Sequence, residues 1–181
     1  KTIAYQNPAY LDDFLAALIP PTVAYLSEQV RAGCSVLQIF DSWAGVLPEP
    51  FFSRFIIHPM RQICVQLKKA FPQVPLIYFP KSCSPYYEHL MASSIGFDAL
   101  SVDCLGVWST TLSHFPQTFP LQGGLDPHIL RAGGECLDQA IHALCSVMSG
   151  RPYIFNLSHG VLPDTPVENI AQLVRCVREK A

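Results

Sequence analysis

The strongest constraint on the fold is a kind of short apolar run that recurs along the chain. Each run is rich in β-branched and aromatic residues and ends at polar or glycine residues, as buried strands do where they lead into loops. The runs cover residues 35–40, 75–79, 99–102, 119–122 and 153–157. Because they are apolar almost throughout and do not alternate with polar residues, they predict a parallel sheet covered on both faces.

Stretches with helical periodicity separate the predicted strands. In the clearest, residues 51–70, apolar side chains recur at intervals of three or four residues, which is typical of an amphipathic helix. Three helix starts carry capping or proline signals: Asn7 before Pro8, Ser84 before Pro85, and Thr165 before Pro166, with Glu168 placed to complete a capping box. The alternation of strands and helices predicts an α/β fold.

Periodicity alone leaves two architectures open. One is a small, open, doubly wound sheet, for which 181 residues is a suitable length. The other is part of an eight-stranded barrel, since a whole barrel takes roughly 250 residues.

Composition narrows the classes of partner. Only 14% of the residues are charged, against roughly 25% in ordinary soluble domains, so we expect much of the surface to be covered. The net charge of −2 argues against nucleic acid as a partner, because phosphate binding needs a concentrated basic face. The longest apolar run, residues 14–26, contains two prolines and is shorter than the roughly 20 residues that span a bilayer. We therefore expect no membrane association.

The cysteines indicate a reducing compartment. Seven are scattered along the chain without a C-x-x-C pair, which fits free thiols better than a disulfide framework or a zinc site. No secretory signal is visible in the sequence, so we expect a cytoplasmic protein. Because the chain opens with Lys1, we also expect that a segment upstream of it has been removed.

In both architectures, function collects at the carboxyl ends of the parallel strands, where the loops converge. The candidate residues are Phe40, Asp41, Ser42 and Trp43 after the first strand, Lys81 and Ser82 after the second, Asp103 and Cys104 after the third, Gln122, Gly123, Gly124, Leu125 and Asp126 after the fourth, and Asn156, Ser158, His159 and Gly160 after the last.

The strand-end residues suggest a hydrolase triad and a metal site, but details of the sequence disfavour both. Ser42, His159 and Asp41 suggest a hydrolase triad, but the G-x-S-x-G turn that presents such a serine is missing. Asp41, Asp103 and Asp126 suit a divalent metal, yet capping a turn or a helix is the favoured interpretation for each.

The remaining candidates favour a pocket without fixing its ligand. His159 stands between two small residues, Ser158 and Gly160, which indicates an exposed place at a strand end. The glycines at 123–124 indicate either a close approach to the backbone or a plain turn. Lys81 suits an anionic substrate and a solvated rim equally well.

Three ordered motifs carry a resemblance to a known family. They are Leu-Gln-Ile-Phe-Asp-Ser-Trp-Ala-Gly at 37–45, Leu-Gln-Gly-Gly-Leu-Asp-Pro at 121–127, and Phe-Asn-Leu-Ser-His-Gly-Val-Leu-Pro-Asp-Thr-Pro at 155–166. Over residues 10–177 the sequence resembles the uroporphyrinogen decarboxylase family, which folds as a (β/α)8 barrel. The resemblance implies that residues 1–181 are a single partial domain, the C-terminal portion of such a barrel. Its five strands would be the fourth to the eighth, with the first three upstream of Lys1.

The resemblance also implies an activity. The family removes carboxylate carbons from the acetate arms of uroporphyrinogen to give coproporphyrinogen, without a metal or an organic cofactor, and it usually forms homodimers. Ser42 matches a serine that contacts the substrate, Phe40 matches an aromatic of the pocket wall, and His159 matches the active-site histidine near a substrate carboxylate. The family's essential aspartate, its arginine-rich segment and its active-site tyrosine lie outside these 181 residues, so we expect the chain alone to be inactive.

The motifs depart from the family pattern at four strand ends. Gly124 stands for the usual asparagine, Ser158 for a glycine, Cys104 for a tryptophan, and Pro80 for a smaller residue. These departures put the geometry of the loops in question more than the type of reaction.

Two other functions remain open. A corrinoid-linked methyltransferase of the same superfamily needs a His-x-Cys pair and a further cysteine for zinc, but Pro80, Lys81 and Ser82 occupy the first position and His159 the second. A non-enzymatic subunit would complete a barrel with a second polypeptide by pairing exposed apolar strand edges.

Overall fold

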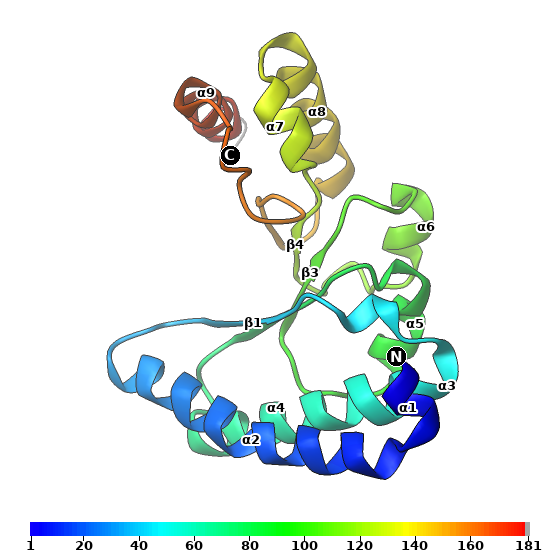
Figure 1. Ribbon diagram of the computed structural model, residues 1–181. Helices are drawn as coiled ribbons and strands as arrows, with labels where there is room; N and C mark the ends of the chain where they lie inside the picture. The colour runs from blue at the N-terminus through cyan, green and yellow to red at the C-terminus, as the bar shows by residue number, and fades with distance from the viewer. Residues whose placement is uncertain (180–181) are drawn as a thin grey trace. The chain divides into compact units, whose positions relative to one another are not determined.

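The computed structural model describes residues 1–179, which contain five strands that alternate with helices (Figure 1). Every strand pairing in this part of the chain is parallel, and the strands follow one another in chain order. The predicted α/β fold with parallel strands is therefore confirmed. The chain divides into two compact units, Lys1–Ala99 and a second that starts at Leu100.

The first unit combines helices with two strands of five residues each. Its elements are α1 (Thr2–Gln6), α2 (Pro8–Arg31), β1 (Leu37–Asp41), the 3-10 turn η1 (Ala44–Val46), α3 (Glu49–Phe52), the π-helical turn η2 (Ser53–Ile57), α4 (His58–Ala70), β2 (Leu76–Pro80), the 3-10 turn η3 (Ser84–Tyr86) and α5 (Tyr87–Ala92).

The second unit contains three shorter strands. Its elements are β3 (Ala99–Val102), which begins at the boundary, α6 (Trp108–Ser113), β4 (Leu121–Gly123), α7 (Pro127–Ala132), α8 (Gly134–Met148), β5 (Tyr153–Ile154) and α9 (Val167–Arg178).

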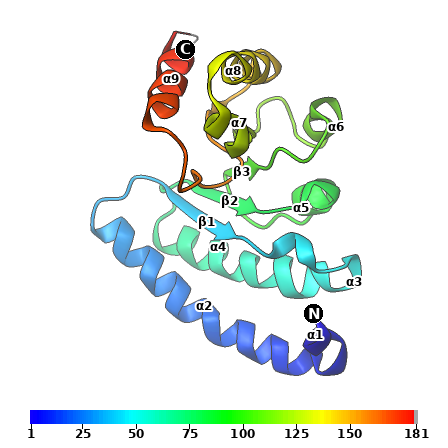
Figure 2. The same cartoon turned by 45° about the horizontal axis from the view of Figure 1, so that its top comes forward.

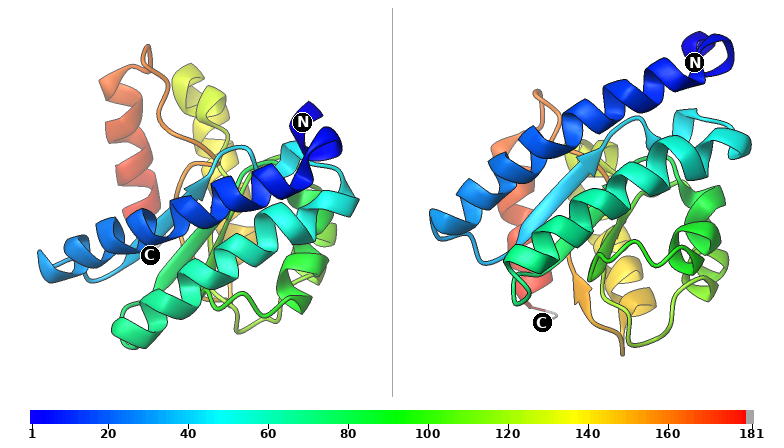
Figure 3. Two further views of the ribbon diagram at one scale, coloured as in Figure 1. Left: turned by 60° about the horizontal axis from the view of Figure 1, so that its bottom comes forward. Right: turned by 90° about the horizontal axis from the view of Figure 1, so that it is seen from below.

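The two strands of the first unit differ in how they are covered. β2 is buried along its whole length, as predicted, whereas β1 alternates. Leu37 and Ile39 of β1 are buried, but Phe40 is 65% exposed. In Figure 3, α2 and α4 run side by side along β1, and Ile39 of β1 lines a cavity together with residues of both helices. The prediction that both faces are covered is wrong for β1, because its second face has no layer over it in this unit.

The helix predicted over residues 51–70 forms as three consecutive pieces, α3, η2 and α4. Pro59 explains the interruption, because proline has no N–H to donate to the carbonyl of Phe55 four residues earlier. The chain widens instead, and the N–H of His58 donates to the carbonyl of Ser53, five residues back. The apolar face continues across this turn, with Phe55 and Met60 both buried.

Of the three helix starts predicted with capping or proline signals, the structure confirms one and contradicts two. The side chain of Asn7 accepts a hydrogen bond from the N–H of Tyr10 at 3.2 Å, so the predicted cap of α2 is confirmed. Ser84 begins a 3-10 turn and caps no helix, and the predicted capping box at Thr165 is wrong. Pro166 is the N-cap of α9, so Thr165 lies one residue too early for its hydroxyl to reach the first free N–H groups.

The core of the second unit lies along α8. Leu137, Ile141 and Leu144 are spaced at three and four residues, and they pack with Leu125 and Leu130 from the segment after β4. Figure 2 shows α7, α8 and α9 gathered on one side of this unit. β4 is its central strand, because it pairs with β3 on one edge and β5 on the other.

No helix within residues 1–179 has both the length and the apolar character that crossing a membrane requires.

Substitutions on α4 test which of its faces supports the fold. Leu67 is 1% exposed and Val65 on the same helix is 58% exposed. Leu67→Ala should lower the free energy of unfolding by about 2–5 kcal/mol, because it leaves a cavity. Val65→Ala should change it by less than about 0.5 kcal/mol. Urea denaturation of both variants measures the difference, and equal losses would contradict the described packing.

Candidate active site

A row of exposed and half-buried side chains lies where β1 ends. Phe40 is 65% exposed and Trp43 is 75% exposed, with the exposed Ser42 between them and half-buried Asp41 before it. The ring of Phe40 meets Phe79 of β2 edge-on, with centroids 6.0 Å apart and an interplanar angle of 83°. This contact fixes the ring beside the strand end, so an aromatic face and a hydroxyl lie next to each other in solvent.

The loops after β1 and β2 are tied together through their backbones. The N–H of Lys81 donates to the carbonyl of Asp41 at 3.0 Å, and the N–H of Gly45 donates to the carbonyl of Lys81 at 3.1 Å. A Cβ atom on Gly45 would lie only 2.0 Å from the carbonyl oxygen of Ser82. Only glycine permits this approach, and the two loops therefore form one rigid layer.

Asp41 caps the turn that follows β1. Its carboxylate accepts the O–H of Tyr78 at 3.2 Å and the backbone N–H groups of Trp43 and Ala44. Burial raises the pKa of Asp41, while these hydrogen bonds oppose the rise. The favoured interpretation of Asp41 as a capping residue is confirmed.

Asp103 and Asp126, the other two aspartates at strand ends, also cap backbone N–H groups. Asp103 is buried, and its Oδ1 accepts the N–H of Leu105 at 3.0 Å. Asp126 is the N-cap of α7 and accepts the N–H of His128 at 2.8 Å. No group of three or more His, Cys, Asp or Glu side chains among residues 1–179 is arranged to hold a metal ion.

The two glycines after β4 are each approached closely by the protein itself. Gly123 and Gly124 have φ angles of +90° and +100°, which favour glycine. A Cβ on Gly123 would lie 2.6 Å from the carbonyl oxygen of Val102, and one on Gly124 would lie 2.4 Å from Cη2 of Trp108. The indole of Trp108 thus occupies the space that the family motif's asparagine would need.

Ser158 and Cys104, two further positions at which the chain departs from the family motif, contact each other. Ser158 is 4% exposed, its N–H donates to the carbonyl of Leu125 at 2.7 Å, and its hydroxyl donates to Sγ of Cys104 at 3.3 Å. His159 and Gly160 follow it and are exposed. Ser158 is therefore a structural residue that leads the chain out to His159.

The predicted site residues fall on both units. Phe40 and Ser42 lie together at the end of β1 in the first unit, and His159 lies after β5 in the second. Sequence reasoning missed Tyr78 and Trp108. A hydroxyl within an otherwise apolar predicted strand was the available signal for Tyr78, because a buried O–H needs an acceptor. Nothing in the sequence linked Trp108 to Gly124.

Parallel strands joined by helices, with exposed side chains beyond the strands' carboxyl ends, define an α/β protein of the kind whose chemistry lies in its βα loops. A sequence model of the uroporphyrinogen decarboxylase family matches residues 1–180. The chain belongs to this family, whose (β/α)8 barrel accounts for the five parallel β/α units.

Individual relatives agree with this assignment. Proteins named uroporphyrinogen decarboxylase from Granulibacter bethesdensis, Maricaulis maris and Rickettsia bellii are 41%, 39% and 36% identical to the chain. The matches cover 98%, 100% and 99% of this chain and 52% of each relative. The chain thus spans about half the length of the curated relatives it matches.

The contact between Gly124 and Trp108 gives a prediction about the altered motif. Gly124→Asn should lower the free energy of unfolding by about 1–3 kcal/mol, because the new side chain overlaps the indole. Gly134→Asn is the matched control, since Gly134 has a φ of +62° and open space around it, so it reports the backbone cost alone.

The double variant Gly124→Asn/Trp108→Ala separates overlap from backbone strain. Its loss of stability should fall short of the sum of the two single losses by more than about 0.5 kcal/mol, as contacting residues do. Thermal and urea denaturation measure this coupling. Strictly additive losses would show that the indole does not fill the place of the asparagine.

Proposed function

We propose that a polypeptide carrying these residues decarboxylates the acetate arms of uroporphyrinogen and gives coproporphyrinogen in tetrapyrrole biosynthesis. The observation that carries the proposal is that the family match extends over residues 1–180 while its motif residues Phe40, Ser42 and His159 are solvent-exposed at strand ends. Residues retained only for packing would be covered. Exposure at these positions supports contact with a substrate.

The reaction needs little covalent chemistry from the protein. When an electron-rich pyrrole is protonated, the cationic ring accepts the electron pair of the bond between the acetate's methylene and carboxylate carbons. Carbon dioxide leaves, the methylene carbon takes up a proton to become a methyl group, and the ring gives up the proton that it had gained, so that a neutral pyrrole is restored. The substrate's own ring serves as the electron sink, so the protein binds the anionic macrocycle, stabilises the cation and excludes water.

The exposed residues suit these tasks. The hydroxyl of Ser42 donates a hydrogen bond to a carboxylate of the substrate, and Phe40 supplies an apolar wall against the flat macrocycle. His159 lies near a carboxylate, where its imidazole holds a proton or donates one. In this proposal Phe40, Ser42 and His159 bind the substrate, and His159 is the catalytic residue of this part of the chain.

The proposal extends to organisation and compartment. Residues 1–181 are taken as the C-terminal portion of one barrel domain, and the active polypeptide as a homodimer. The seven cysteines have free thiols in the structure, which supports a reducing, cytoplasmic setting.

Assay of uroporphyrinogen turnover tests the function. A polypeptide of the relatives' full length that carries these residues should release coproporphyrinogen, and the 181 residues alone should not. In the longer polypeptide, Ser42→Ala and His159→Asn should each lower kcat/KM by about 10- to 100-fold, because each removes a hydrogen bond to a charged group.

Two surface variants are the controls. Ser146 and His142 are exposed on α8, so Ser146→Ala and His142→Asn should leave kcat/KM within about twofold. Failure of the unsubstituted full-length polypeptide to convert uroporphyrinogen would overturn the proposed function. Normal turnover by both site variants would overturn the assigned roles.

A further inference from the structure

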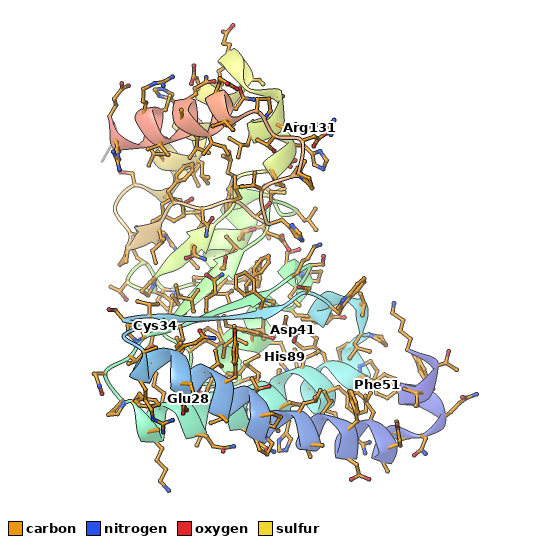
Figure 4. All side chains as sticks on the ribbon, turned by 60° about the vertical axis from the view of Figure 1, so that its left-hand side comes forward. Glu28, Cys34, Asp41, Phe51, His89 and Arg131 are labelled. Atoms are coloured by element: carbon orange, nitrogen blue, oxygen red, sulfur yellow. The ribbon has the colours of Figure 1, made fainter. Side chains whose placement is uncertain are left out.

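We propose that Asp41 and Tyr78 are positioning residues that hold Ser42 at the mouth of the site. The inference rests on the proposed function for its catalytic meaning. Its structural basis is a hydrogen-bonded turn at Asp41, the last residue of β1, which is labelled in Figure 4.

The carboxylate of Asp41 is the centre of this turn. It accepts three donors, the O–H of Tyr78 at 3.2 Å and the N–H groups of Trp43 and Ala44. An aspartate that accepts the N–H two residues ahead closes a ring through the intervening backbone. Ser42 is the residue inside that ring, so its Cα and the direction of its Cα–Cβ bond are fixed, and only rotation about χ1 remains.

A second set of bonds fixes the same turn from its other side. The carbonyl of Asp41 accepts the N–H of Lys81, and Lys81 in turn accepts the N–H of Gly45. The residues on both sides of Ser42 are therefore anchored, and its backbone cannot shift without breaking bonds to β2 or the loop that follows it.

Apolar neighbours increase the importance of the hydrogen bonds that the Asp41 carboxylate accepts. A cavity of about 210 Å³ reaches Asp41, and α2 and α4 line it with apolar side chains and Thr22. Burial already disfavours the charged carboxylate, so each hydrogen bond that Asp41 accepts matters more than it would at the surface.

The thiols that face the pair remain neutral in acid. Cys83 and Cys64 face Tyr78 from the turn after β2 and from α4. Burial raises the pKa of Cys64 to about 12. Burial also raises the pKa of Tyr78, so its hydroxyl remains a donor. Lys81 contacts Asp41 through its backbone N–H. Titration of this cluster below neutral pH is therefore that of the Asp41 carboxyl.

The sign of the pH effect follows from the hydrogen bonds. The O–H of Tyr78 lowers the pKa of Asp41 against the effect of burial. Removing it raises this pKa further, so protonation of Asp41, which disrupts the turn, occurs at higher pH. KM for the substrate should rise as Asp41 becomes protonated, because Ser42 then no longer points at its carboxylate.

Tyr78→Phe tests the inference, because it removes one hydroxyl and keeps the ring. In the full-length polypeptide, KM for uroporphyrinogen should rise about tenfold at neutral pH with kcat within about twofold. The rise of KM on the acid side should move to higher pH. Tyr153→Phe is the matched control, since the hydroxyl of Tyr153 donates to a backbone carbonyl, that of Gly123, at 2.6 Å. It should leave the acid midpoint of KM in place.

Amide hydrogen exchange gives a readout that needs no substrate. The amides of Trp43 and Ala44 should exchange about tenfold faster in Tyr78→Phe and in Asp41→Asn, but not in Tyr153→Phe. Unchanged exchange at both amides would overturn the geometry. Faster exchange with an unchanged KM profile in an active polypeptide would overturn the positioning role. Absence of turnover in the unsubstituted polypeptide would overturn the proposed function, and the positioning role for that reaction with it, while exchange still tests the turn.

Discussion

The parallel register between β1 and β2 is the constraint on which the candidate site of the first unit depends. It sets Ile39 opposite Tyr78 and Asp41 opposite Pro80. Tyr78 then lies close enough to donate its hydroxyl to Asp41, and the next residue, Lys81, donates its N–H to the Asp41 carbonyl. A slip of one residue would turn each side chain to the other face of the sheet. The turn that holds Ser42 therefore requires this strand register.

The strands and the family were predictable because they depend on local composition and on contiguous motifs. β3 was predicted with its observed limits, and the other strands overlap their predicted runs. The errors arose where a single residue overrides periodicity. Pro59 inserts a π-helical turn that an apolar repeat does not reveal, and Pro166 moves a helix start past Thr165. The exposure of Phe40 depends on what covers the sheet, which no local pattern states.

The candidate site was predicted as a set of positions, whereas the contacts that support those positions could not be predicted. The motifs identified Phe40, Ser42 and His159, and the structure places all three in solvent at strand ends. The residues that support the loops come from other parts of the chain, as Trp108 does against Gly124. Departures from the family motif that look independent in sequence, such as Cys104 and Ser158, are in direct contact. Counting each departure from the motif separately therefore overstates the difference between this chain and the family pattern.

The unequal surroundings of the two tryptophans have a spectroscopic consequence. Trp43 is 75% exposed beside Ser42, whereas Trp108 is packed against the glycine turn and the core of the second unit. An aqueous quencher such as iodide would reach the first indole and largely spare the second. The chain thus carries its own fluorophore next to Ser42, where binding of a ligand could be followed without a label.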